Sequence, residues 1–227
     1  EMPKTEHVFL CGETAHGAAL GANTYALSLQ GLDSNVTLRV EDVSGPMVAD
    51  IPDVLLDLLE VASFVYAADA RVSRGGQADA QWGAKWRRSF RLSIPVRDPV
   101  RWSQPAVLAP LRETLSLLSD DFFSFDFVPL TERPQRQSYF TFNEAMPQRP
   151  RVDRVQLFSG GLDSFAGAAE QLADSDLSIA LVSHRSVTKL AKVQLHLIQA
   201  LQQTFGKARV MHIPVWAQLT QQGNKEG

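Results

Sequence analysis

The sequence predicts an α/β fold with a parallel, doubly wound sheet over residues 151–227, preceded by an α+β domain over residues 1–132. After residue 154, buried-strand runs alternate with amphipathic helical patterns, which is typical of parallel sheets covered by helices. The first 132 residues instead combine two long helical patterns with strands in which apolar and polar side chains alternate. Residues 133–150 contain three prolines and several arginines and glutamines, so we interpret them as a linker.

The second region contains three predicted strands and two predicted helices. An apolar run from Val155 leads into a glycine-rich turn and a helix, and a buried-strand run follows over 178–183. A longer helix ends at Gly206, before a last strand over 209–215. Because open parallel sheets bind ligands at the carboxyl ends of their strands, we expect the functional residues there. The longer helix is marked by residues at helical spacing, namely Val187, Leu190, Ala191, Gln194, Leu197, Ile198 and Leu201.

The first region contains four strand patterns and two helical patterns. Residues 86–96 alternate apolar and polar side chains, which predicts a half-buried antiparallel strand with one face in water. Two arginines of this segment and two that follow it are interpreted as polar residues on an exposed face; a docking surface for an acidic partner is the alternative. These arginines are Arg87, Arg91, Arg97 and Arg101, the strand patterns cover 7–11, 36–40, 86–96 and 123–127, and the helical patterns cover 52–72 and 105–118.

A short segment between the first strand and helix of the second region has the composition of a phosphate-binding loop. Two adjacent glycines allow the backbone to turn sharply and bring its N–H groups close to an anion, and the start of the helix adds its positive dipole end. Ser159 is a candidate catalytic residue, and so is Asp163, which can cap the helix or bind Mg²⁺. A tight structural turn and a nucleotide site without turnover are the alternatives. The segment consists of Ser159, Gly160, Gly161, Leu162, Asp163 and Ser164.

A second group of candidate residues follows the next strand. Ser183, His184 and Arg185 lie at its predicted carboxyl end, where open parallel sheets bind their ligands. Lys189 follows on the first turn of the next helix and can reach a phosphate as a point charge. A surface loop and a solvated helix face are the alternative interpretations of these residues.

The Ser-Gly-Gly-Leu-Asp-Ser segment resembles the signature of the PP-loop ATP pyrophosphatases, and residues 155–192 are most similar to QueC, the 7-cyano-7-deazaguanine synthase family. This resemblance implies an adenine nucleotide α-hydrolase-like fold for the second region. It also implies ATP and Mg²⁺ as ligands, adenylation of a 7-deazaguanine-type substrate, and release of pyrophosphate. The residues implied to bind ATP are Ser159 to Ser164, Ser183, His184, Arg185 and Lys189, with Asp163 as the magnesium ligand.

The first 150 residues resemble the N-terminal domain of QueC-like proteins in bacterial antiphage operons, namely the Qat systems (QatC-like) and type IV CBASS. The resemblance implies a partner protein from the same operon, held by residues 1–132, whose N-terminal amine receives the deazapurine. A non-catalytic ATP-binding scaffold and an ordinary 7-cyano-7-deazaguanine synthase are the alternatives. A sulfur-transferring tRNA enzyme fits less well, because Cys11 is the only cysteine.

The composition narrows these expectations. A net charge of -3 and a pI near 6.0 predict no direct binding of nucleic acid. The single cysteine allows no internal disulfide, and no apolar run reaches the length of a membrane span, so we expect a bacterial cytoplasmic protein. Only 64 residues follow Asp163, so the catalytic domain is expected to be cut short. The Zn²⁺ site typical of the family would require a segment beyond Gly227.

Overall fold

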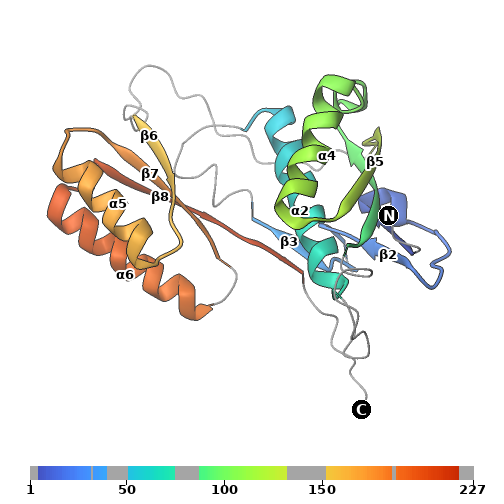
Figure 1. Ribbon diagram of the computed structural model, residues 1–227, viewed down its shortest axis with the longest axis horizontal. Helices are drawn as coiled ribbons and strands as arrows, with labels where there is room; N and C mark the ends of the chain where they lie inside the picture. Colours follow the sequence, from blue (N-terminus) through green and yellow to red (C-terminus); the bar gives the residue numbers. More distant parts are fainter. Residues whose placement is uncertain are drawn as a thin grey trace, which may run out of the picture. The chain divides into compact units, whose positions relative to one another are not determined.

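The computed structural model describes residues 5–31, 33–39, 51–74, 87–131, 152–185 and 188–219, which form two compact units (Figure 1). Unit 1 contains the described residues up to Thr37, those from 52 to 131, and 218–219. Unit 2 contains 38, 39, 51 and the described residues from 152 to 217. The predicted linker over 133–150 lies outside the described residues.

Unit 1 is built on a four-stranded sheet with the order β2-β1-β4-β5, in which every neighbouring pair is parallel. The prediction of an antiparallel strand over 86–96, and with it the α+β class of this region, is therefore wrong. The segments between the strands carry helices, so the chain returns to the same end before each new strand. The strands are β1 (Glu6–Cys11), β2 (Thr24–Leu27), β4 (Ser89–Val96) and β5 (Phe122–Pro129).

The alternation that suggested an antiparallel strand has another cause. Phe90, Leu92 and Ile94 of β4 are fully buried in the core of unit 1, whereas Arg91 is exposed and pairs with Asp126 of the neighbouring strand β5. Alternation thus reports that one face of β4 is better covered than the other, and it carries no information on strand direction.

The helices of unit 1 lie between the strands in the chain. Pro52 precedes α2, and Pro105 begins α4 as a proline in the first turn, where its missing N–H costs nothing. The 3₁₀ helix η1, the helix α3 and the strand β2 were not predicted.

A separate two-stranded sheet pairs β3 with β9, so the predicted strand at 36–40 is confirmed over its first residues. The bounds are η1 (Gly12–Ala15), α2 (Asp53–Arg71), α3 (Pro99–Trp102), α4 (Pro105–Ser119), β3 (Val36–Leu38) and β9 (Ala217–Leu219).

Unit 2 is a three-stranded parallel sheet with the order β6-β7-β8, and both of its helices lie on the same face (Figure 1). Ile179, Leu181 and Val210 point to this face and are buried against Leu172 of α5 and Ile198 of α6. The predicted alternation of strands and helices is confirmed, but the described part of unit 2 has helices on one face only, because its strands follow one another in order across the sheet, so the predicted double winding is not seen there. The elements are β6 (Arg154–Leu157), α5 (Leu162–Ala173), β7 (Ile179–His184), α6 (Thr188–Phe205) and β8 (Val210–Val215).

The described helices also bear on the membrane prediction. Among the residues that the structure describes, no helix combines the length and the apolarity needed to cross a bilayer.

Candidate functional site

The glycine-rich segment of unit 2 forms a tight loop between β6 and α5. Phe158 is 1% exposed and its N–H donates to the Val182 carbonyl at 2.7 Å, so the end of β6 is anchored in the sheet. The chain then turns through Gly160, which has a φ of 84°, a conformation that favours glycine. Gly161 is the N-cap residue of α5. The predicted order of strand, loop and helix is present.

The loop brings together the hydroxyl groups at its two ends. The Oγ atoms of Ser159 and Ser164 lie 3.1 Å apart. Ser159 Oγ accepts a hydrogen bond from the N–H of Gly161 at 3.2 Å, and Ser164 Oγ donates to the carbonyl of Gly161 at 3.0 Å. Ser159 is exposed and Ser164 is partly buried at the beginning of α5, so two hydroxyl groups lie beside a helix N-terminus.

The N-terminus of α5 has the features of an anion-binding site. Its N-cap, Gly161, offers no side chain to the orphan N–H groups of the first turn, and no side-chain capping bond is formed. Asp163 was predicted either to cap the helix or to bind Mg²⁺. It lies in the first turn of α5, so it is not the N-cap residue. Together, a positive helix end, backbone N–H groups and two hydroxyls can bind a phosphate group.

Gln194 of α6 connects this loop with the end of β7, and the sequence interpretation missed its role. The side chain is 1% exposed, and its Nε2 donates to the carbonyls of Ser159 at 3.1 Å and His184 at 3.4 Å. A Cβ atom at Gly160 would lie 2.9 Å from Gln194 Cγ, so glycine is required there for packing as well as for its φ. The sequence feature that could have revealed this role is a glutamine at one of the inward-facing, otherwise apolar positions of the helix.

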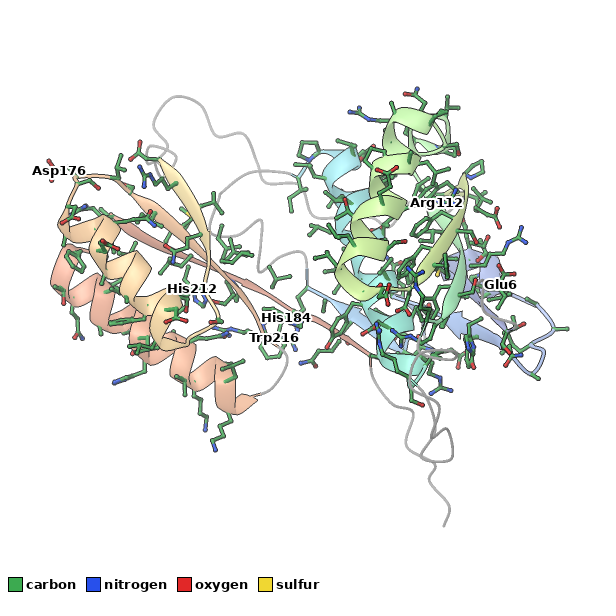
Figure 2. All side chains as sticks on the ribbon, viewed as in Figure 1. Glu6, Arg112, Asp176, His184, His212 and Trp216 are labelled. Atoms are coloured by element: carbon green, nitrogen blue, oxygen red, sulfur yellow. The ribbon has the colours of Figure 1, made fainter. Side chains whose placement is uncertain are left out.

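The residues at the end of β7 have different environments. Ser183 is fully buried, and among the described residues its Oγ has no hydrogen-bond partner. His184 is exposed, and its Nε2 lies 3.0 Å from the carbonyl of Ala217, to which it donates. Figure 2 labels His184 and Trp216 at this edge of the sheet. Through Gln194, the end of β7 and the glycine-rich loop share one buried side chain.

The two predicted cations of the site are placed differently. The guanidinium of Arg185 lies over the ring of Trp216, 5.6 Å from its centroid, and that of Arg39 lies 4.9 Å from the same centroid. Arg185 is therefore part of a cation–π cluster. Lys189 is exposed on the first turn of α6. No hydrogen bond or ion pair joins Lys189 to the loop within the described part of the chain.

A magnesium ion bound with a nucleotide would need few ligands from this site. The described residues contain no group of three or more histidine, cysteine, aspartate or glutamate side chains placed to hold a metal. Mg²⁺ that accompanies phosphates takes most of its ligands from phosphate oxygens and water, with one or two carboxylates from the protein. Asp163, in the first turn of α5, has the chemistry for this role.

His212 of β8 is a second residue that sequence patterns did not identify. Burial, and then the charge of Arg185, lowers the pKa of His212 to about 4. Its register partner is Leu181, so the imidazole lies on the face of the sheet that the helices cover. Among described residues its Nε2 has no hydrogen-bond partner.

We expect unit 2 to lose stability as the pH falls from about 6.5 to about 4. The unfolded chain takes up the His212 proton near pH 6.5, whereas the folded chain takes it up only near pH 4. The loss should approach about 2 to 3 kcal/mol at the acid end of this window. Hydrogen exchange with mass spectrometry measures it separately in unit 2. His212→Phe should flatten the pH dependence there; an unchanged slope in this variant would contradict the assignment.

A comparable variant in unit 1 serves as the control. Burial, and then the charge of Arg88, also lowers the pKa of His7. His7→Phe should therefore change the acid sensitivity of unit 1 and leave the peptides of unit 2 unaffected.

Comparison with known proteins supplies no family for this chain. No protein-family model, no curated protein and no solved structure matches it. The function is therefore argued from the geometry and chemistry of the site described above.

Proposed function

We propose that unit 2 binds ATP with Mg²⁺ and catalyses adenylation of a small substrate with release of pyrophosphate. The observation that carries this proposal is the loop itself: a parallel strand, Gly160 with a φ of 84°, and the hydroxyls of Ser159 and Ser164 within 3.1 Å of each other at the uncapped start of α5. The parallel sheet with its helices on one face is compatible with a Rossmann-like arrangement. An adenine nucleotide α-hydrolase-like fold is the finer assignment that we propose for it.

Each residue of the loop has a role in this proposal. The N–H groups at the start of α5, with Leu162 and Asp163 in its first turn, would donate to the β- and γ-phosphates. The hydroxyls of Ser159 and Ser164 would donate to phosphate oxygens, and Asp163 would bind the magnesium ion. Gly160 and Gly161 keep the loop without side chains, so that phosphate oxygens can approach the backbone. These groups position the triphosphate and compensate its charge, which is the main contribution of a protein to phosphoryl chemistry.

The reaction follows from a triphosphate held by its outer phosphates. A carboxylate or amide oxygen of the substrate would attack the α-phosphorus, forming a new P–O bond while the bond to the β-phosphate oxygen breaks and pyrophosphate leaves. An amine would then attack the activated carbon of the adenylate, release AMP and lose a proton. No side chain needs to act as a nucleophile. His184, Arg185 and Lys189 are proposed to line the nucleoside and phosphate side of the same edge, whereas Ser183, predicted with them, is fully buried and does not line it.

The substrate and acceptor that we propose come from the resemblance to QueC-like proteins. A 7-deazaguanine-type carboxylate is the proposed substrate, and the N-terminal amine of a partner protein encoded in the same bacterial antiphage operon, a Qat system or type IV CBASS, is the proposed acceptor. Unit 1 would hold that partner. An ordinary 7-cyano-7-deazaguanine synthase would use ammonia instead, and a scaffold protein would bind ATP without turnover.

Asp163→Ala is expected to weaken binding of MgATP by a factor of about 10 to 100, because a charge-assisted contact worth about 1.5 to 3 kcal/mol is removed. Isothermal titration calorimetry on the full chain with MgATP measures this change. The matched control is Asp176→Ala, which removes an exposed carboxylate after the other end of α5 and should leave the affinity unchanged. Equal affinities of Asp163→Ala and the unmodified protein would rule out the proposed magnesium ligand.

The reaction is tested by incubating the full chain with MgATP, a 7-deazaguanine carboxylate and the partner protein. Pyrophosphate release with a mass increase of one deazapurine on the partner supports conjugation, and acetylation of the partner's N-terminus should abolish it. A free nitrile base formed with ammonia indicates the ordinary synthase. ATP binding without either product indicates the scaffold.

A further inference from the structure

The parallel sheet of unit 1 has its own topological switch point. From β1 the chain passes outward to β2, and it then crosses to the opposite side of β1 to form β4 and β5. The connections that leave the ends of β1 and β4 therefore run in opposite directions. In open parallel sheets this divergence leaves a crevice outside the carboxyl ends of the two strands, and ligands bind in it.

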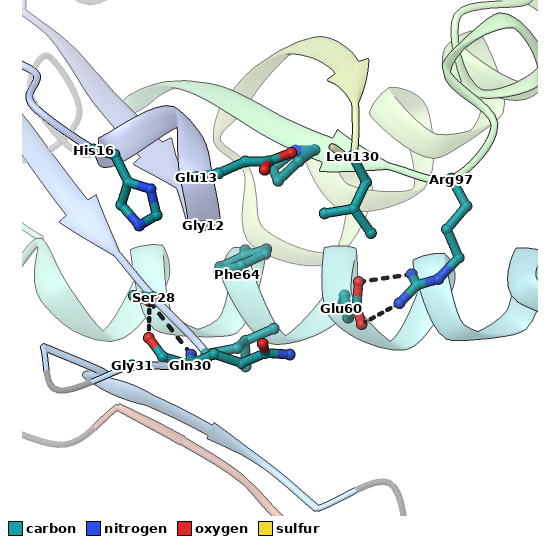
Figure 3. Close-up of a pocket in the computed structure, with 12 residues that line it drawn as sticks. Gly12, Glu13, His16, Ser28, Gln30, Gly31, Glu60, Phe64, Arg97 and Leu130 are labelled. Carbon is teal, nitrogen blue, oxygen red and sulfur yellow. Dashed lines mark hydrogen bonds and ion pairs between the residues drawn. The ribbon is translucent and has the colours of Figure 1, made fainter. Parts of the chain in front are cut away.

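A pocket of about 340 Å³ lies at this position (Figure 3). Segments that follow all four strands of the sheet contribute to it: η1 after β1, the loop after β2, Arg97 after β4 and Leu130 after β5. The helix α2 adds Glu60 and Phe64. The volume lies within the range of small-molecule sites, and residues from distant parts of the sequence converge on it.

The turn at Gly12, which joins β1 to η1, allows close packing beside this pocket. Gly12 has a φ of 55°, and a Cβ atom there would lie 3.0 Å from Cγ of Pro95, another lining residue. A side chain at this position would be strained and crowded at once. The glycine thus lets η1, which carries Glu13 and precedes His16, lie against the end of β4.

The charges around the pocket disfavour an anionic ligand. Arg97, which is 5% exposed, donates to both carboxylate oxygens of Glu60 at 2.9 Å and to Asp57 at 2.6 Å. Its guanidinium is therefore committed to carboxylates. None of the described lining residues is a lysine, and they include a second carboxylate, Glu13. The Glu13 oxygens accept hydrogen bonds from the N–H and the hydroxyl of Thr131, which carry no charge, so no cation is paired with this carboxylate in those contacts.

The remaining lining combines the polar side chains of His16, Ser28 and Gln30 with an apolar surface. Figure 3 shows Glu13 of η1 and the ring of Phe64 of α2 at the pocket, with the Glu60 carboxylate turned toward Arg97. Carboxylates and carbonyls accept hydrogen bonds, so the complementary ligand group is a donor, and a positive charge on that group strengthens the bond. The apolar part of the lining is formed by Leu29, Phe64, Pro95 and Leu130.

We propose that this pocket is a second ligand site of the protein, separate from the glycine-rich loop, and that it binds a small molecule with a protonated amine on a compact apolar body. The carboxylate of Glu13 receives the ammonium group, since each of its oxygens can accept a further hydrogen bond, and Phe64 and Leu130 contact the apolar body. This inference rests on the topology and lining of unit 1 alone, so it does not depend on adenylation by unit 2.

The test uses three probes of similar shape with the full chain: benzylammonium, benzyl alcohol and benzoate. Saturation-transfer NMR titrations should give a dissociation constant of about 5 mM or lower for benzylammonium, as expected of a ligand of this size. Benzyl alcohol should bind at least 5-fold more weakly, and benzoate more weakly still. Intermolecular NOEs should connect the probe ring with the methyl groups of Leu29 and Leu130.

Glu13→Gln should weaken binding of benzylammonium at least 5-fold and leave benzyl alcohol unchanged. The matched control is Glu113→Gln, because Glu113 is an exposed carboxylate on α4 outside the pocket lining. The proposal is overturned if benzoate binds as tightly as benzylammonium, if Glu13→Gln and Glu113→Gln have equal effects, if the NOEs arise from other methyl groups, or if none of the probes binds.

Discussion

Replacing Arg97 by methionine is expected to lower the free energy of unfolding of unit 1 by about 3 to 5 kcal/mol. Arg97 is 5% exposed and is paired with Asp57 and Glu60, whose side chains are 0% and 11% exposed. Burial opposes the charged guanidinium, but the hydrogen bonds to Glu60 and Asp57 outweigh it and raise the pKa of Arg97. Methionine fills much of the same volume and leaves two buried carboxylates without this cation, which is the costly arrangement.

A second arginine of the same neighbourhood provides the control. Arg91 pairs with Asp126 at 2.8 Å, but both side chains are about half exposed, so Arg91→Met should change stability little. Hydrogen exchange of peptides from α2 and β4 reports the stability of unit 1 without contributions from unit 2. If both variants were destabilised equally, the burial of Arg97 with Asp57 and Glu60 would not be the cause of the lost stability. Replacing Arg97, Asp57 and Glu60 together by apolar residues should recover much of the loss.

The second large effect is expected from Gly160→Ala, which should weaken MgATP binding more than 10-fold and destabilise unit 2 by about 2 to 3 kcal/mol. Two penalties combine here. The φ of 84° is unfavourable for any residue with a Cβ atom, and this atom would lie 2.9 Å from Gln194 Cγ. Moving Gln194 would in turn disturb its bonds to the carbonyls of Ser159 and His184. Calorimetry and hydrogen exchange measure the two effects.

Gly206 allows the two penalties to be separated. It has a φ of 95°, after the end of α6, and a Cβ atom there would meet nothing within 4 Å. Gly206→Ala should therefore show the backbone penalty of about 1 kcal/mol and leave ATP affinity unchanged. In the double variant Gly160→Ala with Gln194→Ala, part of the loss should be relieved because Cγ is absent. Equal effects at Gly160 and Gly206 would mean that contact with Gln194 is unimportant.

The elements that sequence patterns predicted are those whose signal is local. The run from Val155, the glycine pair and the helical spacing after Asp163 are adjacent in the chain, so their order and their hydrogen-bonding groups follow from short-range sterics and hydrophobic periodicity. The helical patterns over 52–72 and 105–118 begin at Pro52 and Pro105, and the helices of the structure begin at Asp53 and Pro105. The loop at 159–164 could therefore be identified as a candidate phosphate site before its tertiary surroundings were known.

Other properties depended on contacts between residues distant in the sequence. Alternation along 86–96 indicated a half-covered strand, but only its pairing with β1 and β5 made it a parallel one. Arg97 resembled a surface residue until Asp57 and Glu60, some 40 positions earlier, enclosed it. Gln194 became part of the site because α6 packs over Gly160. Local sequence thus determined which segments form strands, helices and the glycine-rich turn, whereas strand direction, the buried charges and the pocket of unit 1 were decided by long-range packing, which no local pattern encodes.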